Sequence, residues 1–339
     1  MTETTLPTPP EPDTIALPDY ATFHEVVRPG NRPVVMRGLV ADWPAVAAAR
    51  QGDRAIVDYI ARCGTTRPVA GLIADPEERG RFFYNAQVTG LNFRKMELQL
   101  DEFLEAVLAE ADKPAPHALA VQSESIPEVS PAFAAENKLA LLPQVPPRIW
   151  LGNRVQVAPH FDLMENVACN IAGRRRFTLF PPEQITNLYP GPIELTPAGT
   201  PISMVDPANP DLARYPRYAE AWGAALQVTL EPGDALYLPY GWWHGVQALE
   251  PLSILVNYWW ADTPAGIGAP YDALLNALLA YRHLPPAQRK VWRNMLMHFA
   301  FPEDEDPAAH LPEYARGILG PGSPQLFARM RAMLRQAQG

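Results

Sequence analysis

Two histidines and one aspartate in this chain have the types and the spacing to hold one metal ion. His160 and Asp162 stand two residues apart, and alternate side chains of a β-strand point to the same face. His244 follows a Pro-Gly-Asp turn at 232–234 and an apolar run, so it can join them from another strand. This is the facial ligand set of mononuclear non-haem iron, which leaves positions open for a bidentate co-substrate and O2. We predict that these three residues are the metal ligands and the catalytic centre.

Other interpretations of the three residues compete with the iron site. A His-x-Asp pair also arises by chance in strands and caps, where polar side chains satisfy ordinary hydrogen bonds. Zinc usually takes more nitrogen or sulfur ligands in a closed tetrahedron, yet a zinc-dependent isomerase or hydrolase stays an alternative. The remaining histidines have no carboxylate or cysteine at ligand spacing and are interpreted as surface or core residues: His24, His117, His283, His298 and His310.

An arginine run after the His-x-Asp pair offers a site for an anion. The segment 166–182 predicts a hairpin with its turn near Gly173, and strand alternation groups Arg175 with Phe177 and Leu179 on the apolar face. A guanidinium inside a barrel is costly unless an anion pairs with it, and its planar fork suits a carboxylate. If the register slips by one residue, Arg175 is solvated instead, and Arg154 becomes the reserve candidate.

The elements that must position these residues are predicted to be mainly strands between Ala118 and Trp260. Apolar and β-branched runs separated by turn residues indicate a barrel or sandwich of antiparallel strands. The predicted strands cover residues 148–151, 167–171, 177–180, 235–238 and 254–260. An α/β section precedes them, with a β-branched run at 33–39 and helical spacing at 100–108. Helical spacing returns after residue 263, where apolar faces would cap the barrel or pair with another copy.

Size and charge limit the classes of partner. The chain has 339 residues, 47% of them hydrophobic and 19% charged, which is enough for one large core or two moderate ones. Its net charge of -9 would repel phosphate backbones, so a nucleic-acid partner is not expected.

Composition also predicts the compartment. Two cysteines, Cys63 and Cys169, lack the spacing of a zinc or redox pair and favour a reducing compartment. Residues 1–14 are proline-rich and acidic and predict a disordered tail without a signal peptide. The sequence contains no run of 18 consecutive apolar residues, so it does not predict a membrane span. We therefore expect a soluble cytoplasmic protein.

Several longer motifs resemble one known family. They are HFDLMENVACNIAGRRRFTLFPPEQITNLYPGP, GDALYLPYGWWHGV, ILVNYWW and the earlier RPVVMRGLVADWPA. They are similar to the cupin-like JmjC oxygenases that depend on Fe(II) and 2-oxoglutarate, a family that includes the asparaginyl hydroxylase acting on hypoxia-inducible factor. The resemblance covers roughly residues 15–262 and is strongest over 152–260.

The resemblance implies a fold and a division of the chain. The implied fold is mainly β with flanking helices: a double-stranded β-helix of the jelly-roll, cupin or JmjC type, with an α/β N-terminal section and a helical C-terminal tail. The cupin-like JmjC domain would span residues 15–262, with its core barrel at about 115–262. Residues 263–339 would form a helical extension that, by the habit of the family, makes a homodimer.

The resemblance also implies roles for individual residues. Fe(II) would bind at His160, Asp162 and His244, and Arg175 would hold 2-oxoglutarate where the family usually has lysine. Asn166 and Asn257 fall on positions beside the co-substrate, although ordinary strand hydrogen bonds explain them equally well.

Two departures from the family remove hydroxyl donors from the co-substrate pocket, because Val157 replaces a threonine and Ala120 replaces a tyrosine. The pocket would then hold 2-oxoglutarate differently, bind it weakly or prefer another carboxylate.

The activity that follows is hydroxylation of a protein side chain or a small molecule, with O2 and 2-oxoglutarate consumed. Tyr84, Asn85 and Trp243 would lie on the substrate side, unless the large rings simply belong to the core. The main alternative, favoured by the lost hydroxyl donors, is a metal-binding cupin without oxygenase activity that serves as a binding or regulatory module.

Overall fold

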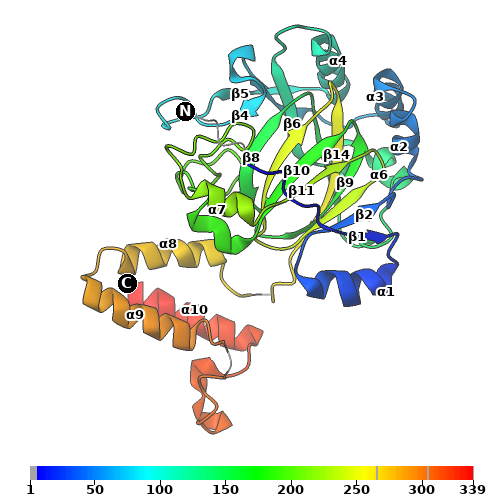
Figure 1. Ribbon diagram of the computed structural model, residues 1–339. Coiled ribbons are helices and arrows are strands. Elements are labelled where there is room, and N and C mark those ends of the chain that lie inside the picture. Colours follow the sequence, from blue (N-terminus) through cyan, green and yellow to red (C-terminus); the bar gives the residue numbers. More distant parts are fainter. Residues whose placement is uncertain (1–5, 265, 304, 339) are drawn as a thin grey trace. The chain divides into compact units, whose positions relative to one another are not determined.

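Two β-sheets face each other in the computed structural model of the protein, which describes residues 6–264, 266–303 and 305–338 (Figure 1). The larger sheet has the strand order β1 (Asp13–Ala16), β2 (Val34–Arg37), β12 (Ala235–Leu238), β9 (Glu165–Ala172), β14 (Ser253–Trp260), β7 (Pro147–Gly152), β6 (Ala118–Ser125), β3 (Val69–Ala74) and β5 (Phe93–Leu98). The smaller sheet has the order β11 (Leu226–Leu230), β10 (Arg175–Phe180), β13 (Trp243–Ala248), β8 (Gln156–Phe161) and β4 (Arg81–Phe82). The predicted fold class, mainly β with flanking helices, is confirmed.

Successive strands of the barrel alternate between the two sheets. From β7 to β10 the chain crosses between the sheets three times, because β7 and β9 lie in the larger sheet and β8 and β10 lie in the smaller one. The predicted hairpin at Gly173 is therefore wrong in one respect, because β9 and β10 lie in different sheets and do not pair with each other. The turn itself is where the sequence predicted it, and Gly173 takes a positive φ of 67° there. A tight turn has the same local pattern whether it folds a strand back or passes it to another sheet.

Apolar side chains from both sheets fill the space between them. The larger sheet contributes Val35, Ala168, Leu236 and Leu255, and the smaller sheet contributes Phe177, Leu179, Val228 and Leu230. Along β10 the residues that point inward are Phe177 and Leu179, which places Arg175 on the same inner face.

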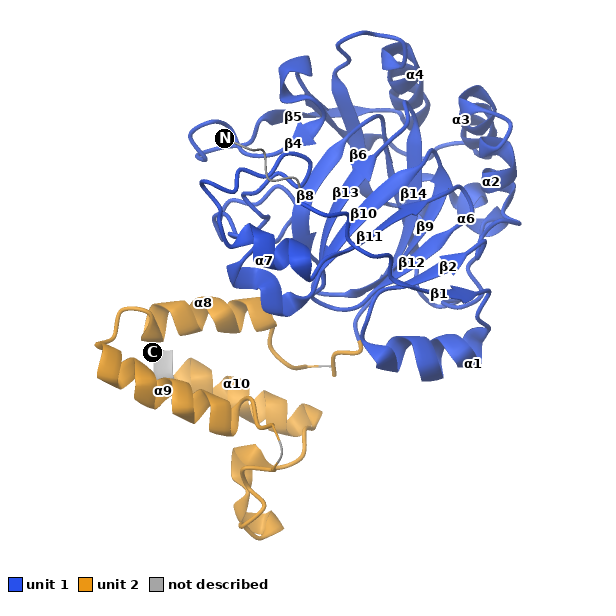
Figure 2. Ribbon diagram, viewed as in Figure 1, with its two compact units in different colours: residues 1–261 blue, residues 262–339 orange. Residues whose placement is uncertain are grey.

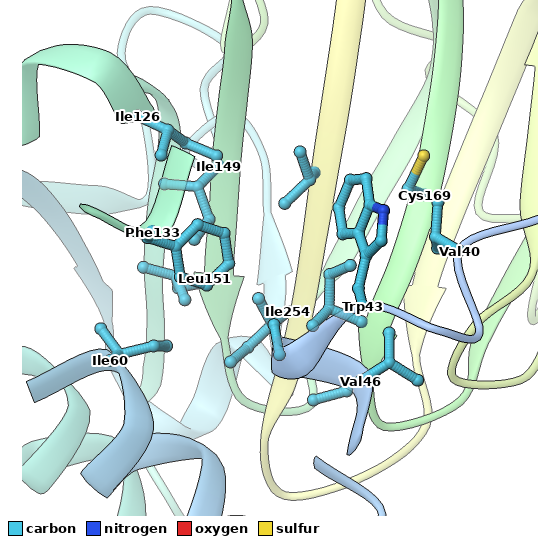
Figure 3. Close-up of a cluster of buried hydrophobic side chains, with 14 of the residues drawn as sticks. Val40, Trp43, Val46, Ile60, Ile126, Phe133, Ile149, Leu151, Cys169 and Ile254 are labelled. Atoms are coloured by element: carbon cyan, nitrogen blue, oxygen red, sulfur yellow. The ribbon is translucent and has the colours of Figure 1, made fainter. Parts of the chain in front are cut away.

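Helices cover the outer face of the larger sheet. They are α2 (Pro44–Ala49), α3 (Asp53–Cys63), α4 (Leu100–Glu110), α5 (Ile126–Val129) and α6 (Pro131–Glu136). Helix α3 turns Ile56 and Ile60, four residues apart, into a core that also contains Cys169 and Ile254 from the sheet (Figure 3). Helix α4 begins with a capping box, in which Gln99 and Glu102 satisfy each other's backbone amides.

The segment 181–225 covers the outer face of the smaller sheet. It contains η4 (Pro182–Thr186) and α7 (Tyr218–Gly223). Tyr218 and Leu188 from this segment pack against Phe180 and Trp243 from the sheet. This layer separates the back of the strands that carry His160 and His244 from solvent.

The N-terminal segment differs from the predicted disordered tail. Residues 1–5 lie outside the described residues, but Asp13 and Thr14 belong to β1, which pairs with β2 in parallel. The Trp222 indole donates to the Pro7 carbonyl at 2.6 Å, and the Gln227 amide donates to the Pro10 carbonyl at 2.9 Å. Prolines lack an amide hydrogen but keep their carbonyl acceptors, so a proline-rich segment can still dock on a donor-bearing surface. Three short helical elements follow β1 in the sequence: α1 (Tyr20–Thr22), η1 (Phe23–Val27) and η2 (Arg28–Gly30). A further short helix, η3 (Pro76–Glu78), lies between β3 and β4.

Residues 262–339 form a second unit, which is helical as predicted (Figure 2). Its elements are α8 (Pro270–Tyr281), α9 (Pro286–Phe299), η5 (Glu313–Ala315), η6 (Gly317–Leu319) and α10 (Pro324–Gln338). Within the described part of the chain, no helix has the length and apolar character needed to span a membrane.

Replacement of Gly173 by alanine should destabilise the barrel, because a Cβ there would overlap the Leu252 carbonyl and would force a side chain into positive φ. We expect Gly173→Ala to lower the free energy of unfolding by about 1–3 kcal/mol in urea denaturation. Gly223→Ala is the control, because a Cβ at Gly223 meets nothing within 4 Å. Equal stability of the two variants would contradict the close contact at this turn.

Candidate active site

The three predicted metal ligands come together on the inner face of the smaller sheet. His160 on β8 and His244 on β13 are register partners, and Asp162 follows the end of β8. One nitrogen or oxygen atom from each residue lies within 4.8 Å of the other two. The His244 Nε2 atom is 3.6 Å from the Asp162 Oδ2 atom.

Backbone contacts orient both imidazole rings toward this point. The Nδ1 atom of His160 lies 3.0 Å from the Ala158 carbonyl, and that of His244 lies 3.0 Å from the Trp242 carbonyl. A carbonyl only accepts, so each Nδ1 carries the hydrogen and each Nε2 keeps a free lone pair. Burial, assisted by the neighbouring His244, lowers the pKa of His160 and keeps its ring neutral at neutral pH.

The Asp162 carboxylate supplies the observation that tests this site for a cation. Its Oδ2 atom is buried and has no hydrogen-bond partner. A buried carboxylate oxygen without a donor is costly, and a bound cation would remove that cost. With the imidazole nitrogens of His160 and His244 beside it, the donor set fits a divalent transition metal such as Fe(II).

An irregularity in β8 sets the direction of its inward side chains. His244 pairs with His160 but Val246 pairs with Val157, so β8 contains one residue more than β13 over this stretch. A Cβ on Gly245 would lie 3.1 Å from the Pro159 ring, which shows how closely the bulge approaches β13. The bulge puts Val157 on the same inner face as His160. Arg154, the reserve candidate, is six residues before His160, but the bulge shifts the alternation between them by one residue, and Arg154 is exposed.

Arg175 lies inside the barrel, as strand alternation predicted. Only 7% of its surface is exposed, and its Nη2 and Nε atoms lie 2.6 and 3.1 Å from the Ser253 hydroxyl. Burial lowers the pKa of Arg175 to about 10, so the group remains charged at neutral pH. Within the described residues no carboxylate forms an ion pair with it. The barrel thus holds an interior cation without a protein counter-ion.

The distance between Arg175 and the three ligands suits a short dicarboxylate. Leu179 is the register partner of His244, and Arg175 lies four residues further along β10 on the same face. Four residues of strand span roughly 13 Å. An arginine side chain that extends back toward the ligands, together with a five-carbon dicarboxylate, can bridge that span.

Asn166 and Asn257 form a buried amide pair on the larger sheet. The Asn257 Nδ2 group donates to the Asn166 Oδ1 atom at 2.9 Å, while the Asn257 Oδ1 atom is buried without a partner. The hydrogen bond agrees with the ordinary interpretation of these residues, and the free acceptor leaves capacity for a ligand. Their role beside a co-substrate therefore stays a prediction.

Comparison with known proteins identifies the family. The family profile of the cupin-like domain matches residues 20–266 of this chain. The chain belongs to the cupin-like domain family.

Relatives of this cupin-like domain include proteins named as enzymes. The human bifunctional peptidase and (3S)-lysyl hydroxylase JMJD7 is 28% identical, over 73% of this chain and 83% of its own. Lysine-specific demethylase 8 of Xenopus tropicalis is 25% identical, over 72% of this chain and 51% of its own. Human HSPB1-associated protein 1 is 36% identical over 113 residues, which are 33% of this chain. The match spans only 22% of the length of that protein.

The cupin-like domain also contains two tryptophans that the sequence reasoning missed. Trp150 and Trp259 contact each other edge to face at 5.7 Å, and both indole Nε1 groups are buried without a partner. Trp259 lies two residues beyond Asn257, so strand alternation alone could have placed it on the same face.

The three residues predicted for the substrate side do not meet at the ligand cluster. Trp243 is 2% exposed and packs with Phe180 on the outer face of β13, because neighbouring strand residues point to opposite faces. Tyr84 packs against Ile202 in a buried cluster, and the Asn85 side chain accepts the Thr89 amide in a turn. The contacts of Tyr84 and Trp243 agree with the interpretation that the large rings belong to the core.

Removal of a ligand should abolish metal binding by this cupin-like domain. We expect His160→Ala and Asp162→Ala to lose Fe(II) measured after anaerobic loading and gel filtration, since the remaining two side chains cannot complete the set. His117→Ala is the control, because that histidine is 39% exposed and lies beside Glu110. Unchanged iron content in His160→Ala would show that the ion binds elsewhere.

Proposed function

We propose that the protein is an Fe(II)- and 2-oxoglutarate-dependent oxygenase that hydroxylates a protein side chain or a small molecule. The observation that carries the proposal is Arg175, a buried charged guanidinium on the same inner face as His160 and His244, which has no carboxylate partner among the residues that the structure describes. Membership of the cupin-like family and relatives named as a lysyl hydroxylase and a lysine demethylase support it.

The residues of the candidate active site would have distinct roles. His160, His244 and Asp162 would hold Fe(II), and Arg175 would hold the distal carboxylate of 2-oxoglutarate with its planar fork. Bound iron would supply the activation of O2 that couples decarboxylation of 2-oxoglutarate to hydroxylation of a C–H bond. The apolar residues Leu179, Phe177 and Val246 would keep water away from that reaction.

The relatives favour a protein side chain as the substrate, because one is named as a lysyl hydroxylase and another as a lysine-specific demethylase. A small molecule remains the other proposed class. Nucleic acid is not proposed, since the net charge of -9 disfavours it.

A metal-binding module without oxygenase activity is the second candidate function. It is favoured by Val157 and Ala120, which offer no hydroxyl where the family has donors. This candidate predicts that no succinate forms from 2-oxoglutarate under any condition, whereas slow turnover without a primary substrate would contradict it. A zinc enzyme on the same barrel would instead show activity with stoichiometric zinc and no response to iron.

Anaerobic titration of Fe(II) and 2-oxoglutarate into metal-free protein tests the proposal. We expect a visible metal-to-ligand charge-transfer band that is absent in His160→Ala. In Arg175→Ala the affinity for 2-oxoglutarate should fall about tenfold to hundredfold, because one charge-assisted contact is lost. Arg176→Ala is the matched control, since that neighbour lies on the opposite face of β10 and should leave the band unchanged. Iron binding without any band would favour the module over the enzyme.

We also propose that the protein forms a homodimer through its helical second unit. Large apolar side chains are exposed along α8 and α9, among them Leu275, Leu279 and Trp292. Burial of such surface against a second copy would be favourable.

Light scattering at micromolar concentration should give the mass of two chains. Leu279, which is 84% exposed, is the position to alter, and Leu279→Glu should shift the mass toward one chain. Leu17→Glu serves as the control, because Leu17 is 64% exposed but belongs to the first unit. A monomeric wild-type protein would refute the dimer.

A further inference from the structure

A second cavity lies on the outer face of the smaller sheet, away from the candidate active site. Its volume is about 330 Å³, and the segment 181–225 lines it with Asp206, Pro207, Ala208 and Trp222. Arg176 of β10, Gln156 of β8 and Gln247 of β13 line it from the sheet. These three side chains belong to the face opposite to His160 and His244. Val157 and Val246 also line the cavity, but none of the three metal ligands does, so the cavity is distinct from the metal centre.

Arg81 reaches the same cavity from β4, at the edge of the sheet. Its guanidinium lies over the Phe83 ring at 3.6 Å, which holds the plane of the group in one orientation. The Nη2 atom is buried and has no hydrogen-bond acceptor. A buried guanidinium nitrogen that lacks an acceptor is costly in the absence of a ligand.

Arg176 is a second cation in this cavity and has no protein counter-ion among residues 6–264, 266–303 and 305–338. The two guanidinium groups repel each other unless an anion sits between them. Burial lowers the pKa of Arg81, whereas Asp206, which lines the cavity, and Glu78, which does not, favour its charged form from beyond ion-pair distance. The Asp206 Oδ1 atom accepts the Ala208 amide. The charged side chains that line the cavity are thus two arginines and one aspartate, which gives its lining a net positive charge.

We propose that this outer cavity is a second binding site, which takes a small carboxylate anion. The planar forks of Arg81 and Arg176 match the two oxygens of a carboxylate, and the amide groups of Gln156 and Gln247 can donate to the same ligand. The cavity has room for a small molecule of a few heavy atoms and is too small for a folded partner. This site goes beyond the proposed oxygenase reaction and does not depend on it.

Calorimetric titration of succinate into metal-free protein tests the site. Arg176→Gln and Arg81→Gln should each weaken succinate binding about tenfold, because each removes a charge-assisted contact. Asp206→Asn should strengthen binding, because it removes the one negative charge of the cavity and keeps the Oδ1 acceptor. Thermal unfolding of every variant shows that the fold survives. Absence of succinate binding to the wild-type protein would overturn the proposal.

Arg175→Gln is the matched control, because Arg175 is next to Arg176 in the sequence but lies on the inner face of β10. We expect the succinate binding that depends on Arg176 to remain in Arg175→Gln. If Arg175→Gln abolishes all binding while Arg176→Gln and Asp206→Asn change nothing, the ligand occupies only the barrel interior and the proposal is wrong. Inorganic phosphate is the second probe, and tighter binding of phosphate than of succinate would overturn the assignment to a carboxylate.

Discussion

Uncompensated charge inside the barrel is the constraint on which this structure depends. Arg175 remains protonated at neutral pH and donates to the Ser253 hydroxyl, and no donor among the described residues reaches the buried Asp162 Oδ2 atom. An isolated charge in such surroundings costs several kcal/mol, which the protein tolerates only if another interaction offsets it. The two charges have opposite sign but do not pair with each other, so each is available to a different ligand. A cation at Asp162 and an anion at Arg175 would neutralise both at once.

The barrel keeps these charges apart by its topology. Strands alternate between two sheets, and the space between them is filled by side chains such as Phe177, Leu236 and Leu255. His160 and His244 meet because β8 and β13 are neighbours, and the bulge at Pro159 turns both Val157 and His160 inward. Layers on the outer faces, from α3 on one side and α7 on the other, stabilise the sheets. The outward residues of the smaller sheet, including Arg176, thereby line a space of their own.

Sequence patterns could predict the residues whose position depends on strand alternation alone. His160 and Asp162 share a face because they stand two apart, and Arg175 lies inside because it is in phase with Phe177 and Leu179. The same rule places Trp243 on the face opposite to His244, where it packs with Phe180, and not on the predicted substrate side. By contrast, contacts with residues far away in the sequence determine which sheet the strand after Gly173 joins. The docking of the proline-rich N-terminus on Trp222 likewise depends on a partner 215 residues away.

Anomalous X-ray diffraction at the iron edge tests the central claim most directly, on crystals grown anaerobically with Fe(II) and 2-oxoglutarate. The account predicts one iron peak among the Nε2 atoms of His160 and His244 and the Asp162 carboxylate. It also predicts density for a dicarboxylate that joins the iron to the Arg175 guanidinium. An iron peak at any other place, or an occupied metal site with Arg175 still bonded only to Ser253, would contradict it.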